Sequence, residues 1–415
     1  MVDTVKMGAF LASRRRTLGM TQQQVAARLC ISFQAVSRWE TGAACPNTEL
    51  LPDLAALLQV TIDELLAGQC REEGLSYQKA GVDISYTDAI KTEMRRLLQT
   101  PDSNVLNGVG PFASLYDFHF PEMERPVLVL KSEEPGSKQK LALEYGYTDS
   151  ICRDLINHLV NDIAVMGAKP LAVLDTIICG NPEKDTICSL VRGMAEACRE
   201  NDCSLVGGET SVQPQVVERG TYILTASIAG VADRKALLDG SAIRPGDVVL
   251  AVASNGLHTN GYSLVRMMLD RSPRLKLEQV AGEPFLCQLM KPHTAYYPML
   301  RQLRAPLHGM AHITGGGIEG NLCRIIPEGC SARIQLNQIR PLPVFSFIKQ
   351  QGNIPDAEML STFNCGVGLI LVAPAGSEAE IIRQLAPFAS CYPIGEISQG
   401  EGKIVFSGEM HWPGW

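Results

Sequence analysis

Hydrophobic residues in the first ~68 positions recur every three or four residues, with polar residues between them. This spacing predicts five short amphipathic helices. Thr21 and Ser32 stand where the second and third helices should begin, because each hydroxyl can accept a hydrogen bond from a first-turn amide. The third helix would bury Val36 and Trp39 and end at Gly42. The pattern therefore predicts an all-α domain at the start of the chain.

The pattern changes after a short polar stretch, GQCREEGLS, at residues 68–76, which we interpret as a linker. From Tyr77 onward, glycine-rich loops alternate with Val, Leu and Ile runs and with amphipathic segments, which is typical of α/β domains. We expect a helical domain at 1–68, a linker at 69–76, a first α/β domain at 77–238 and a second at 239–415.

The helical domain is similar to a known DNA-binding family. Its sequence TQQQVAARLCISFQAVSRWETG, followed by PNTELLPDLAALLQVTIDELL, resembles the helix-turn-helix of the Cro/C1 repressor type over residues 7–68. The resemblance implies that the third helix enters the major groove and that the start of the second contacts phosphate. The DNA-facing residues that it implies are Gln22, Ser32, Phe33, Gln34, Ser37 and Arg38. Gln34 could pair with adenine, and Arg38 with guanine or phosphate. A helical module that makes only protein contacts is the alternative.

The overall composition is that of a globular protein, with 46% hydrophobic and 20% charged residues among 415. No apolar run approaches the ~20 residues that cross a bilayer, and the N-terminus lacks a secretory signal pattern, so we expect a cytoplasmic protein. The thirteen cysteines include no Cys-x-x-Cys pair and are interpreted as small buried hydrophobic residues. The net charge of −7 argues against nonspecific nucleic-acid binding by the whole chain.

A turn in the first α/β domain has features of a phosphate site. The strand RPVLVLKSE is followed by Pro135, Gly136 and Ser137, and then by a helix that begins near Lys138. Free amides at a helix start favour anions and the lysine adds positive charge, so phosphate is the natural ligand. Ser137 could equally serve as a helix cap alone.

The next helix places Asp154, His158, Asn161 and Asp162 at spacings that put most of them on one face. Carboxylate and amide groups buried without partners are costly, which favours a role in holding a hydrated divalent cation and phosphates. A solvated helix face is the alternative.

Four further polar loops, each rich in glycine, adjoin a strand or a helix. They are SLVGGET, with Gly207, Gly208, Glu209 and Thr210; SNGLHTNGYS, with Asn255, His258, Asn260 and Ser263; HITGGG, with His312, Thr314, Gly315 and Gly316; and FNCG, with Asn364. Glycine lets the backbone approach a ligand closely, and free loop amides bind anions. We therefore expect these loops to converge on a ligand.

Together the motifs resemble the phosphoribosylformylglycinamidine cyclo-ligase (aminoimidazole ribonucleotide synthetase) family over residues 76–410. The resemblance rests on SYQKAGVDI, NGVGPFASL, VNDIAVMGAKPLAVLD, SLVGGET, GDVVLAVASNGLHTNGYSLVR, HITGGGIEGN and TFNCGVG. It implies two α/β domains, a homodimer whose first-domain strands form a barrel, and ATP with Mg²⁺ bound between the domains. It also implies the reaction, in which ATP activates the formyl amide oxygen as an iminophosphate and the amidine nitrogen displaces phosphate to close the imidazole ring.

The resemblance also implies roles for individual residues. For ATP these are Glu133, Gly136, Ser137, Lys138, Asp154, Asn161, Gly207, Gly208, Glu209 and Thr210, with Glu133, Asp162 and Glu209 as the Mg²⁺ ligands. For the phosphoribosyl amidine substrate they are Asn255, Asn260, Ser263, Thr314, Gly315, Gly316 and Asn364. The expected catalytic residues are His258, His312 and Asp162. The histidines could bind substrate or transfer a proton, and either role needs only hydrogen-bond reach.

Two departures from the family pattern fall in the ATP half of the expected site. Where the family has Asp-Gly-Val-Gly-Thr-Lys, residues 133–138 read Glu-Glu-Pro-Gly-Ser-Lys, so Glu134 adds a negative charge and Pro135 removes an amide donor. Where the family has Ala-Glu-Met-Pro-Gly after GGET, residues 211–215 read Ser-Val-Gln-Pro-Gln and lack the carboxylate.

Two functional hypotheses follow. The first is an ATP-dependent cyclo-ligase of de novo purine biosynthesis, converting formylglycinamidine ribonucleotide to aminoimidazole ribonucleotide, with an attached DNA-binding domain. The second is a transcription regulator whose enzyme-like half senses a purine precursor or nucleotide without turnover.

Overall fold

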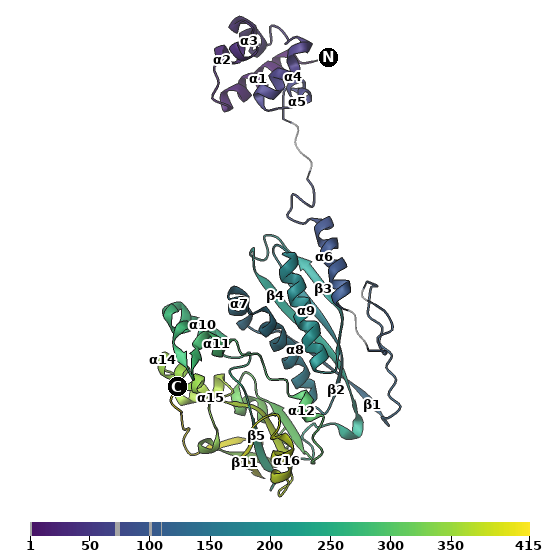
Figure 1. The fold of residues 1–415 in the computed structure, drawn as a ribbon, viewed down its shortest axis with the longest axis vertical. Helices are drawn as coiled ribbons and strands as arrows, with labels where there is room; N and C mark the ends of the chain where they lie inside the picture. Colours follow the sequence, from purple (N-terminus) through teal and green to yellow (C-terminus); the bar gives the residue numbers. More distant parts are fainter. Residues whose placement is uncertain (1, 71–74, 99–101, 109) are drawn as a thin grey trace. The chain divides into compact units, whose positions relative to one another are not determined.

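A computed structural model describes residues 2–70, 75–98, 102–108 and 110–415. The chain divides into two compact units, Met1–Ala80 and Gly81–Trp415, called here the helical domain and the body (Figure 1). Within the described residues, each helix is too short or too polar to span a lipid bilayer. The boundaries expected at residues 68, 76 and 238 stay predictions.

The helical domain contains the five predicted helices. They are α1 (Thr4–Thr17), α2 (Gln22–Arg28), α3 (Phe33–Glu40), α4 (Leu51–Leu58) and α5 (Ile62–Ala67), with a 3-10 turn, η1 (Thr48–Leu50), before α4. The predicted caps are present: Thr21 and Gln24 form a reciprocal capping box, and Ser32 accepts from the amide of Ala35. Val36 and Trp39 are buried in the small apolar core, as expected.

The first half of the body is a four-stranded sheet with helices on one face. The strands are β1 (Pro126–Glu133), β2 (Lys169–Cys179), β3 (Ser204–Val212) and β4 (Tyr222–Asp233), in the order β1-β4-β2-β3. The pair β2 and β3 is parallel, whereas the other neighbours are antiparallel. The helices of this half are α6 (Ile84–Leu97), α7 (Lys138–Glu144), α8 (Thr148–Ala164) and α9 (Lys184–Glu200), and η2 (Arg234–Ala236) follows β4. α8 packs on β1, β2 and β4, and α9 packs on α8 and β3.

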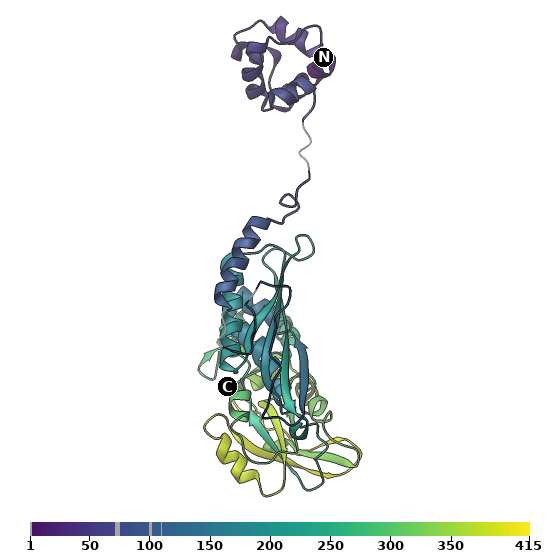
Figure 2. The same cartoon turned by 90° about the vertical axis from the view of Figure 1, so that its right-hand side faces the viewer.

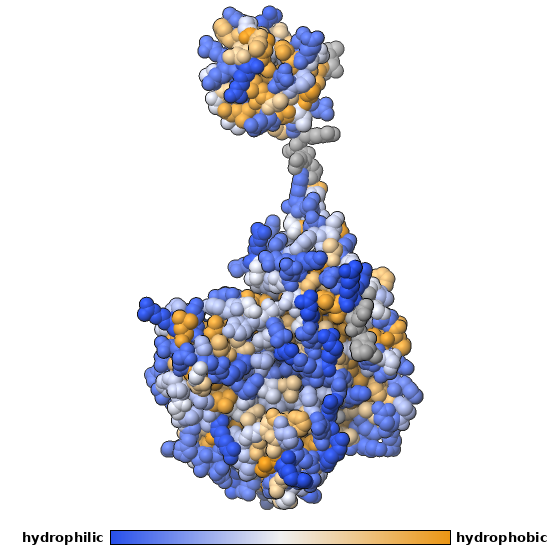
Figure 3. Space-filling view, in the orientation of Figure 1, coloured by the Kyte–Doolittle hydropathy of each residue, from blue (hydrophilic) through white to orange (hydrophobic). Residues whose placement is uncertain are grey.

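The opposite face of this sheet leaves leucines exposed. Leu128, Leu130 and Leu174 are 51%, 68% and 48% exposed. The first two alternate along β1, and the strand register places all three on the side away from α8. Figure 2 shows helices on one side of the sheet, and Figure 3 shows patches of apolar surface on the flank where β1 and the segment before it lie. We call this surface the open face.

The second half of the body is built on a six-stranded sheet in the order β12-β9-β11-β5-β10-β8. Its strands are β5 (Val248–Ala253), β8 (Gly309–His312), β9 (Cys330–Gln335), β10 (Val367–Ala373), β11 (Cys391–Gln399) and β12 (Ile404–Ser407). A small hairpin pairs β6 (Gln279–Val280) with β7 (Glu283–Pro284). The helices are α10 (Tyr262–Arg271), α11 (Phe285–Leu289), α12 (Tyr297–Leu300), α13 (Gly317–Leu322), α14 (Pro343–Gly352), α15 (Asp356–Thr362) and α16 (Glu378–Leu385), with 3-10 turns η3 (Pro273–Leu277) and η4 (Leu336–Gln338).

A segment without regular secondary structure, residues 290–296 between α11 and α12, ties the second half to α8. Asp154 Oδ1 accepts from the amide of His293 at 2.7 Å, and Asn157 donates to the carbonyl of the same residue at 2.7 Å. Asn161 binds the next backbone groups, donating to the Thr294 carbonyl and accepting from the Tyr296 amide. We call residues 290–296 the anchored segment.

Lys138, at the start of α7, completes this attachment. Its side chain is fully buried, and Nζ lies 2.7 Å from Asp154 Oδ2 and 2.7 Å from the carbonyl oxygen of Lys291. A charged group tolerates such burial only when it is paired and hydrogen-bonded. The ion pair therefore fastens α7, α8 and the anchored segment at one point.

We expect Lys138→Met to lower the free energy of unfolding by ~3–5 kcal/mol, because it leaves the Asp154 carboxylate buried without its counter-charge. Thermal denaturation followed by circular dichroism measures the loss. The matched control is Lys140→Met, an exposed lysine of the same helix, which should change stability by less than ~0.5 kcal/mol. Equal melting temperatures for Lys138→Met and the wild type would show that the ion pair contributes nothing.

Candidate functional site

A cleft of about 600 Å³ lies where β1 and α8 meet the loops of the second sheet. From the first half it is lined by Lys131, Glu133, His158 and Asp162, and from the second by Asn260, His312, Thr314, Gly315, Asn321 and Arg324. The structure thus brings together two of the three predicted metal ligands, two of the three predicted catalytic residues and three of the predicted substrate-binding residues.

Two carboxylates share one lysine at the edge of this cleft. Lys131 Nζ lies 3.0 Å from Glu133 Oε2 and 3.0 Å from Asp162 Oδ2. Strand alternation explains the arrangement, because Lys131 and Glu133 are two residues apart on β1 and face α8. Burial opposes ionisation of Asp162, but the hydrogen bond with His312 and the charges nearby outweigh it and hold the pKa of Asp162 below its usual range. Asp162 is therefore a carboxylate at neutral pH.

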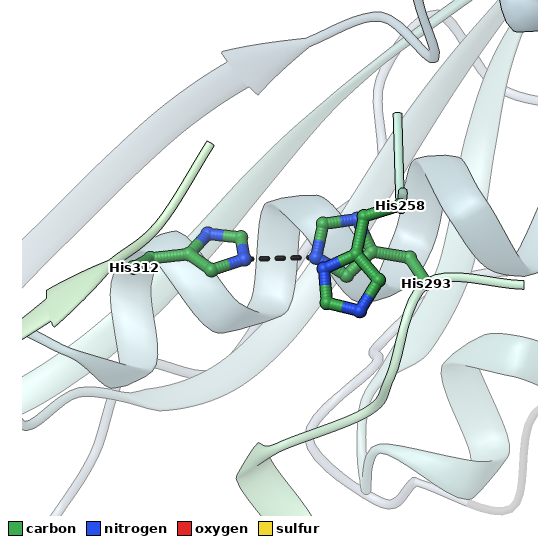
Figure 4. A group of neighbouring side chains, drawn as sticks. All are labelled: His258, His293 and His312. Atoms are coloured by element: carbon green, nitrogen blue, oxygen red, sulfur yellow. Dashed lines mark hydrogen bonds between the residues drawn. The ribbon is translucent and has the colours of Figure 1, made fainter. Parts of the chain in front are cut away.

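Four histidines form a cluster beside Asp162, and two of them, His312 and His158, lie next to its carboxylate. Nδ1 of His312 lies 2.7 Å from Asp162 Oδ1, and its Nε2 lies 2.8 Å from Nε2 of His293 (Figure 4). His258 stacks on His293 with 3.9 Å between ring centroids, and His158 Nε2 is 3.8 Å from Asp162 Oδ2. Burial lowers the pKa of His258 and His293 well below the ordinary value, and burial with the nearby His312 lowers the pKa of His158 to about 4. These three rings are therefore neutral at pH 7.

The other predicted substrate-binding residues lie around the cleft without lining it. Asn255 donates to the carbonyl of Pro292 at 2.9 Å, and so holds the anchored segment. Asn364 donates to the carbonyl of Gly256 at 3.0 Å and so ties two of the predicted loops together. The Ser263 hydroxyl is 3.5 Å from that of Ser137, and Gly316 adopts φ +92 at the start of α13.

The predicted phosphate loop has a conformation that glycine favours. Gly136 has φ +63, and a Cβ added there would lie 3.2 Å from the carbonyl oxygen of Thr259. The Ser137 hydroxyl makes no cap hydrogen bond to α7, and Glu134 is exposed. Lys138 points into the interior, where burial lowers its pKa.

Asp154 and Asn161, expected on a ligand-binding helix face, are buried, and their polar atoms bind Lys138 and the anchored segment. Burial outweighs the effect of Lys138 and raises the pKa of Asp154 to about 6. The alternative of a solvated face does not hold for these two residues or for His158, because all three are buried.

The GGET motif lines a different cleft, of about 620 Å³, on β2 and β3. It is lined by Gly207, Gly208, Glu209 and Thr210 together with Lys91, Arg95, Ser114 and Asp175. Within one chain, the predicted metal ligands are therefore divided, with Glu133 and Asp162 in the first cleft and Glu209 in the second. Asp175 is 2% exposed, and burial, with a contribution from the Glu209 charge, raises its pKa to about 7.

Sequence reasoning missed Lys131, His293 and Asp175. Asp175 is a lone acid in the apolar run LAVLDTII, a signal that could have been recognised. Lys131 and Glu133 share the period of a strand, so their common face could also have been recognised. His293 gave no such signal, because it stands in a segment without helical or strand periodicity.

The expected DNA-facing residues lie at the start of α2 and along α3. Ser32, Phe33, Gln34 and Arg38 are exposed, and Ser37 is half-buried. Gln22 Nε2 donates to Glu40 Oε2 at 2.8 Å, and Arg15 pairs with the same carboxylate. Burial opposes ionisation of Glu40, but its bonds with Arg15 and Gln22 lower its pKa, so α1, α2 and α3 are joined around a fixed charge.

Comparison with known families and proteins agrees with this architecture. Residues 128–232 match the model of the AIR synthase related protein N-terminal domain, residues 244–407 match the corresponding C-terminal domain, and residues 11–65 match a helix-turn-helix model. The phosphoribosylformylglycinamidine cyclo-ligase of Methylobacillus flagellatus is 41% identical over 337 residues, which cover 80% of this chain and 97% of that protein. The protein of the same name from Carboxydothermus hydrogenoformans is 38% identical over 342 residues, which cover 81% and 99%.

Solved structures with low sequence identity share the fold of the body. E. coli HypE superimposes with a TM-score of 0.58 at 17% identity, covering 78% of this chain and 94% of that one. Thiamine-monophosphate kinase from Stenotrophomonas maltophilia gives 0.55 at 17% identity, covering 80% and 98%, and the hydrogenase maturation protein HypE in complex with ATP gives 0.56 at 16%, covering 79% and 92%. Because the body matches the cyclo-ligases over nearly their whole length, the chain belongs to the phosphoribosylformylglycinamidine cyclo-ligase family, with a helix-turn-helix domain preceding it.

Proposed function

We propose that the body is an active cytoplasmic cyclo-ligase, which uses ATP to convert formylglycinamidine ribonucleotide to aminoimidazole ribonucleotide. The observation that carries the proposal is the cleft in which Glu133 and Asp162 face the loops of Asn260 and Thr314. Carboxylates on one wall and polar glycine-rich loops on the other suit a substrate with a phosphate group and a metal-bound nucleotide. The shared family supports the choice of reaction.

The donor set fits Mg²⁺. Glu133 and Asp162 offer carboxylate oxygens, the ligands that this ion prefers, and both side chains are partly exposed, at 23% and 19%. Lys131 pairs with both carboxylates and offsets one of their two negative charges, and we propose that it moves toward the nucleotide phosphates when a cation takes its place. ATP supplies the phosphoryl group that activates the formyl amide oxygen.

The histidines complete the proposed chemistry. His312 carries its Nδ1 hydrogen toward Asp162, which fixes the ring orientation, and its Nε2 lies against His293 at the edge of the cleft. His258 is neutral at pH 7 because burial lowers its pKa, so it takes part in hydrogen bonds as an uncharged ring. We propose that these two rings bind and orient the ribonucleotide near the closing ring, within hydrogen-bond reach.

We expect the purified full-length protein to release ADP when given formylglycinamidine ribonucleotide and Mg-ATP. Asp162→Asn should lower kcat by ~10²-fold or more. The neutral amide loses the charge that attracts the cation, and it loses the ionic hydrogen bond that orients the His312 ring. Asp185→Asn, an exposed aspartate on α9, is the matched control and should leave kcat unchanged.

The proposal fails if the wild-type protein binds the ribonucleotide yet releases no ADP above background. In that case the double variant Glu134→Gly/Pro135→Val tests the loop, because it removes the extra charge and returns a backbone donor. Recovery of turnover would locate the defect in the loop.

A second candidate function is supported by the placement of Lys138. Its Nζ is fully buried against Asp154, whereas a phosphate-binding lysine needs access to its ligand. We infer as the alternative a DNA-binding regulator whose body senses a purine precursor or nucleotide without turnover. Ligand binding without ADP release, together with a change in DNA affinity, distinguishes it from the enzyme.

We propose that the body forms a homodimer through the open face. An apolar sheet surface carrying Leu128, Leu130 and Leu174 is unfavourable in water, and pairing with a second copy would cover it. The expectation that the first-domain strands of two chains form a barrel supports this choice.

Leu130→Asp should convert the dimer to a monomer, because it places a charge in the apolar interface. Light scattering after size-exclusion chromatography measures the mass. Leu277→Asp, at a leucine that is also exposed but lies on η3, should leave the dimer intact. A wild-type monomer, or a Leu130→Asp dimer, would contradict the open face as the interface.

We propose that the dimer presents two helical domains to an inverted-repeat operator. Recognition helices of this motif act in pairs about one duplex turn apart. The exposed set on α3 suits base contacts, and the body supplies the pairing.

Gln34→Ala or Arg38→Ala should each weaken specific binding by ~1–3 kcal/mol in a fluorescence-anisotropy titration, if each contacts a base. Gln350→Ala, an exposed glutamine on α14 of the body, should have no effect. A selection with genomic DNA that returns no enriched motif would refute operator binding. Equal affinity of isolated residues 1–70 would refute the body as the pairing platform.

A further inference from the structure

Three histidines from separate parts of the second half meet in the interior beside the cleft. His258 comes from the loop before α10, His293 from the anchored segment and His312 from the end of β8 (Figure 4). Their side chains are nearly inaccessible, since the residues are 1%, 1% and 5% exposed. One nitrogen from each ring can be chosen so that all three lie within 4.8 Å of one another.

The hydrogen bonds place one hydrogen between two of the rings. The Asp162 carboxylate only accepts, so Nδ1 of His312 carries a hydrogen. Nε2 of His312 and Nε2 of His293 lie 2.8 Å apart, so one of these two nitrogens donates and the other accepts. Both Nε2 atoms are thus directed at one point between the rings, which a single proton occupies.

The remaining ring nitrogens show that this arrangement is incomplete. Nδ1 of His258 and Nδ1 of His293 are both buried without a hydrogen-bond partner. A buried polar atom without a partner costs free energy, and here two lie in one cluster. A metal ion, which accepts an electron pair from an imidazole nitrogen, would give a partner to a ring nitrogen that now lacks one and so remove part of this cost.

We propose that His258, His293 and His312 form a binding site for a transition-metal ion of the zinc class. Imidazole nitrogens are ligands for Zn²⁺, Co²⁺, Ni²⁺ and Cu²⁺, whereas Mg²⁺ and Ca²⁺ prefer oxygen. The site is therefore distinct in chemistry from the Mg²⁺ site proposed at Glu133 and Asp162.

The surroundings suit such an ion. Asp162 already holds the far nitrogen of His312, which is the carboxylate–histidine–metal arrangement that orients a ligand ring and raises its basicity. Two nitrogens bound to a tetrahedral ion at 2.0–2.1 Å lie about 3.3 Å apart, so the pair at 2.8 Å needs to open only slightly. The proton between the two Nε2 atoms would leave, with His293 carrying its own hydrogen on Nδ1, and the stacked ring of His258 would rotate away from His293 to direct a nitrogen at the ion.

The cleft provides a route and an open position for the ion. His312 lines the cleft while the other two rings lie deeper. Three histidines leave a fourth tetrahedral position for a water or a ligand group from the cleft. Metal binding would also fasten the anchored segment to β8, so the occupied site would stiffen the wall of the cleft.

The experiment uses the full-length protein, cleared of metal with a chelator and titrated with Co²⁺ and then with Zn²⁺. We expect one Co²⁺ per chain with the visible absorption of a tetrahedral nitrogen site, and its displacement by Zn²⁺. His293→Gln and His258→Gln should abolish the band, and Asp162→Asn should weaken metal affinity by ~10–100-fold. His119→Gln, at an exposed histidine outside the cluster, should behave as the wild type.

The readout does not depend on turnover, so failure of the cyclo-ligase assay leaves it intact. Melting curves in chelator identify a variant that does not fold, and the other histidine variant then gives the answer. The proposal is overturned if the wild type binds no Co²⁺, if both histidine variants keep the band, or if only a near-ultraviolet thiolate band appears, since that would place the ion on cysteines.

Discussion

The backbone of the anchored segment imposes the constraint on which the body depends. Its amides and carbonyls lie in the interior without a helix or a strand to pair them, and each buried group must find a partner. α8 supplies those partners through Asp154, Asn157 and Asn161, at helical spacings of three and four residues. Because α8 also packs on the first sheet, one set of hydrogen bonds positions both walls of the cleft.

The local elements could be predicted because their causes are local. Thr21 and Ser32 cap helices through hydrogen bonds to amides only three residues further along the chain. Strand β1 is recognisable because its side chains alternate between more and less exposed positions. The premise that Asp154 and Asn161 need partners was also available from sequence, since burying such groups alone is costly. The identity of those partners could not be predicted, because Lys138 and residues 290–296 come close to Asp154 and Asn161 only in the folded chain.

Lys131, Glu133 and Asp162 form a cluster that stabilises the fold and also contains the proposed Mg²⁺ ligands. With no cation present the Lys131 ammonium group lies between two carboxylates and reduces the repulsion between them. A divalent ion would compete with that ammonium group for the same oxygens. The net affinity for the ion is therefore the free energy of binding the carboxylates minus the free energy of displacing the ammonium group. Ionic strength and cation concentration act on this balance together.

The anchored segment also bears on how the site can change in evolution. At Lys291, Pro292, His293 and Thr294 its backbone carbonyls are held by side chains of other elements. A substitution at position 293 can therefore introduce or remove a reactive group beside the cleft without redirecting the chain. A scaffold of this kind separates the retention of the fold from the acquisition of new chemistry at position 293, which lies 2.8 Å from a ring that lines the cleft.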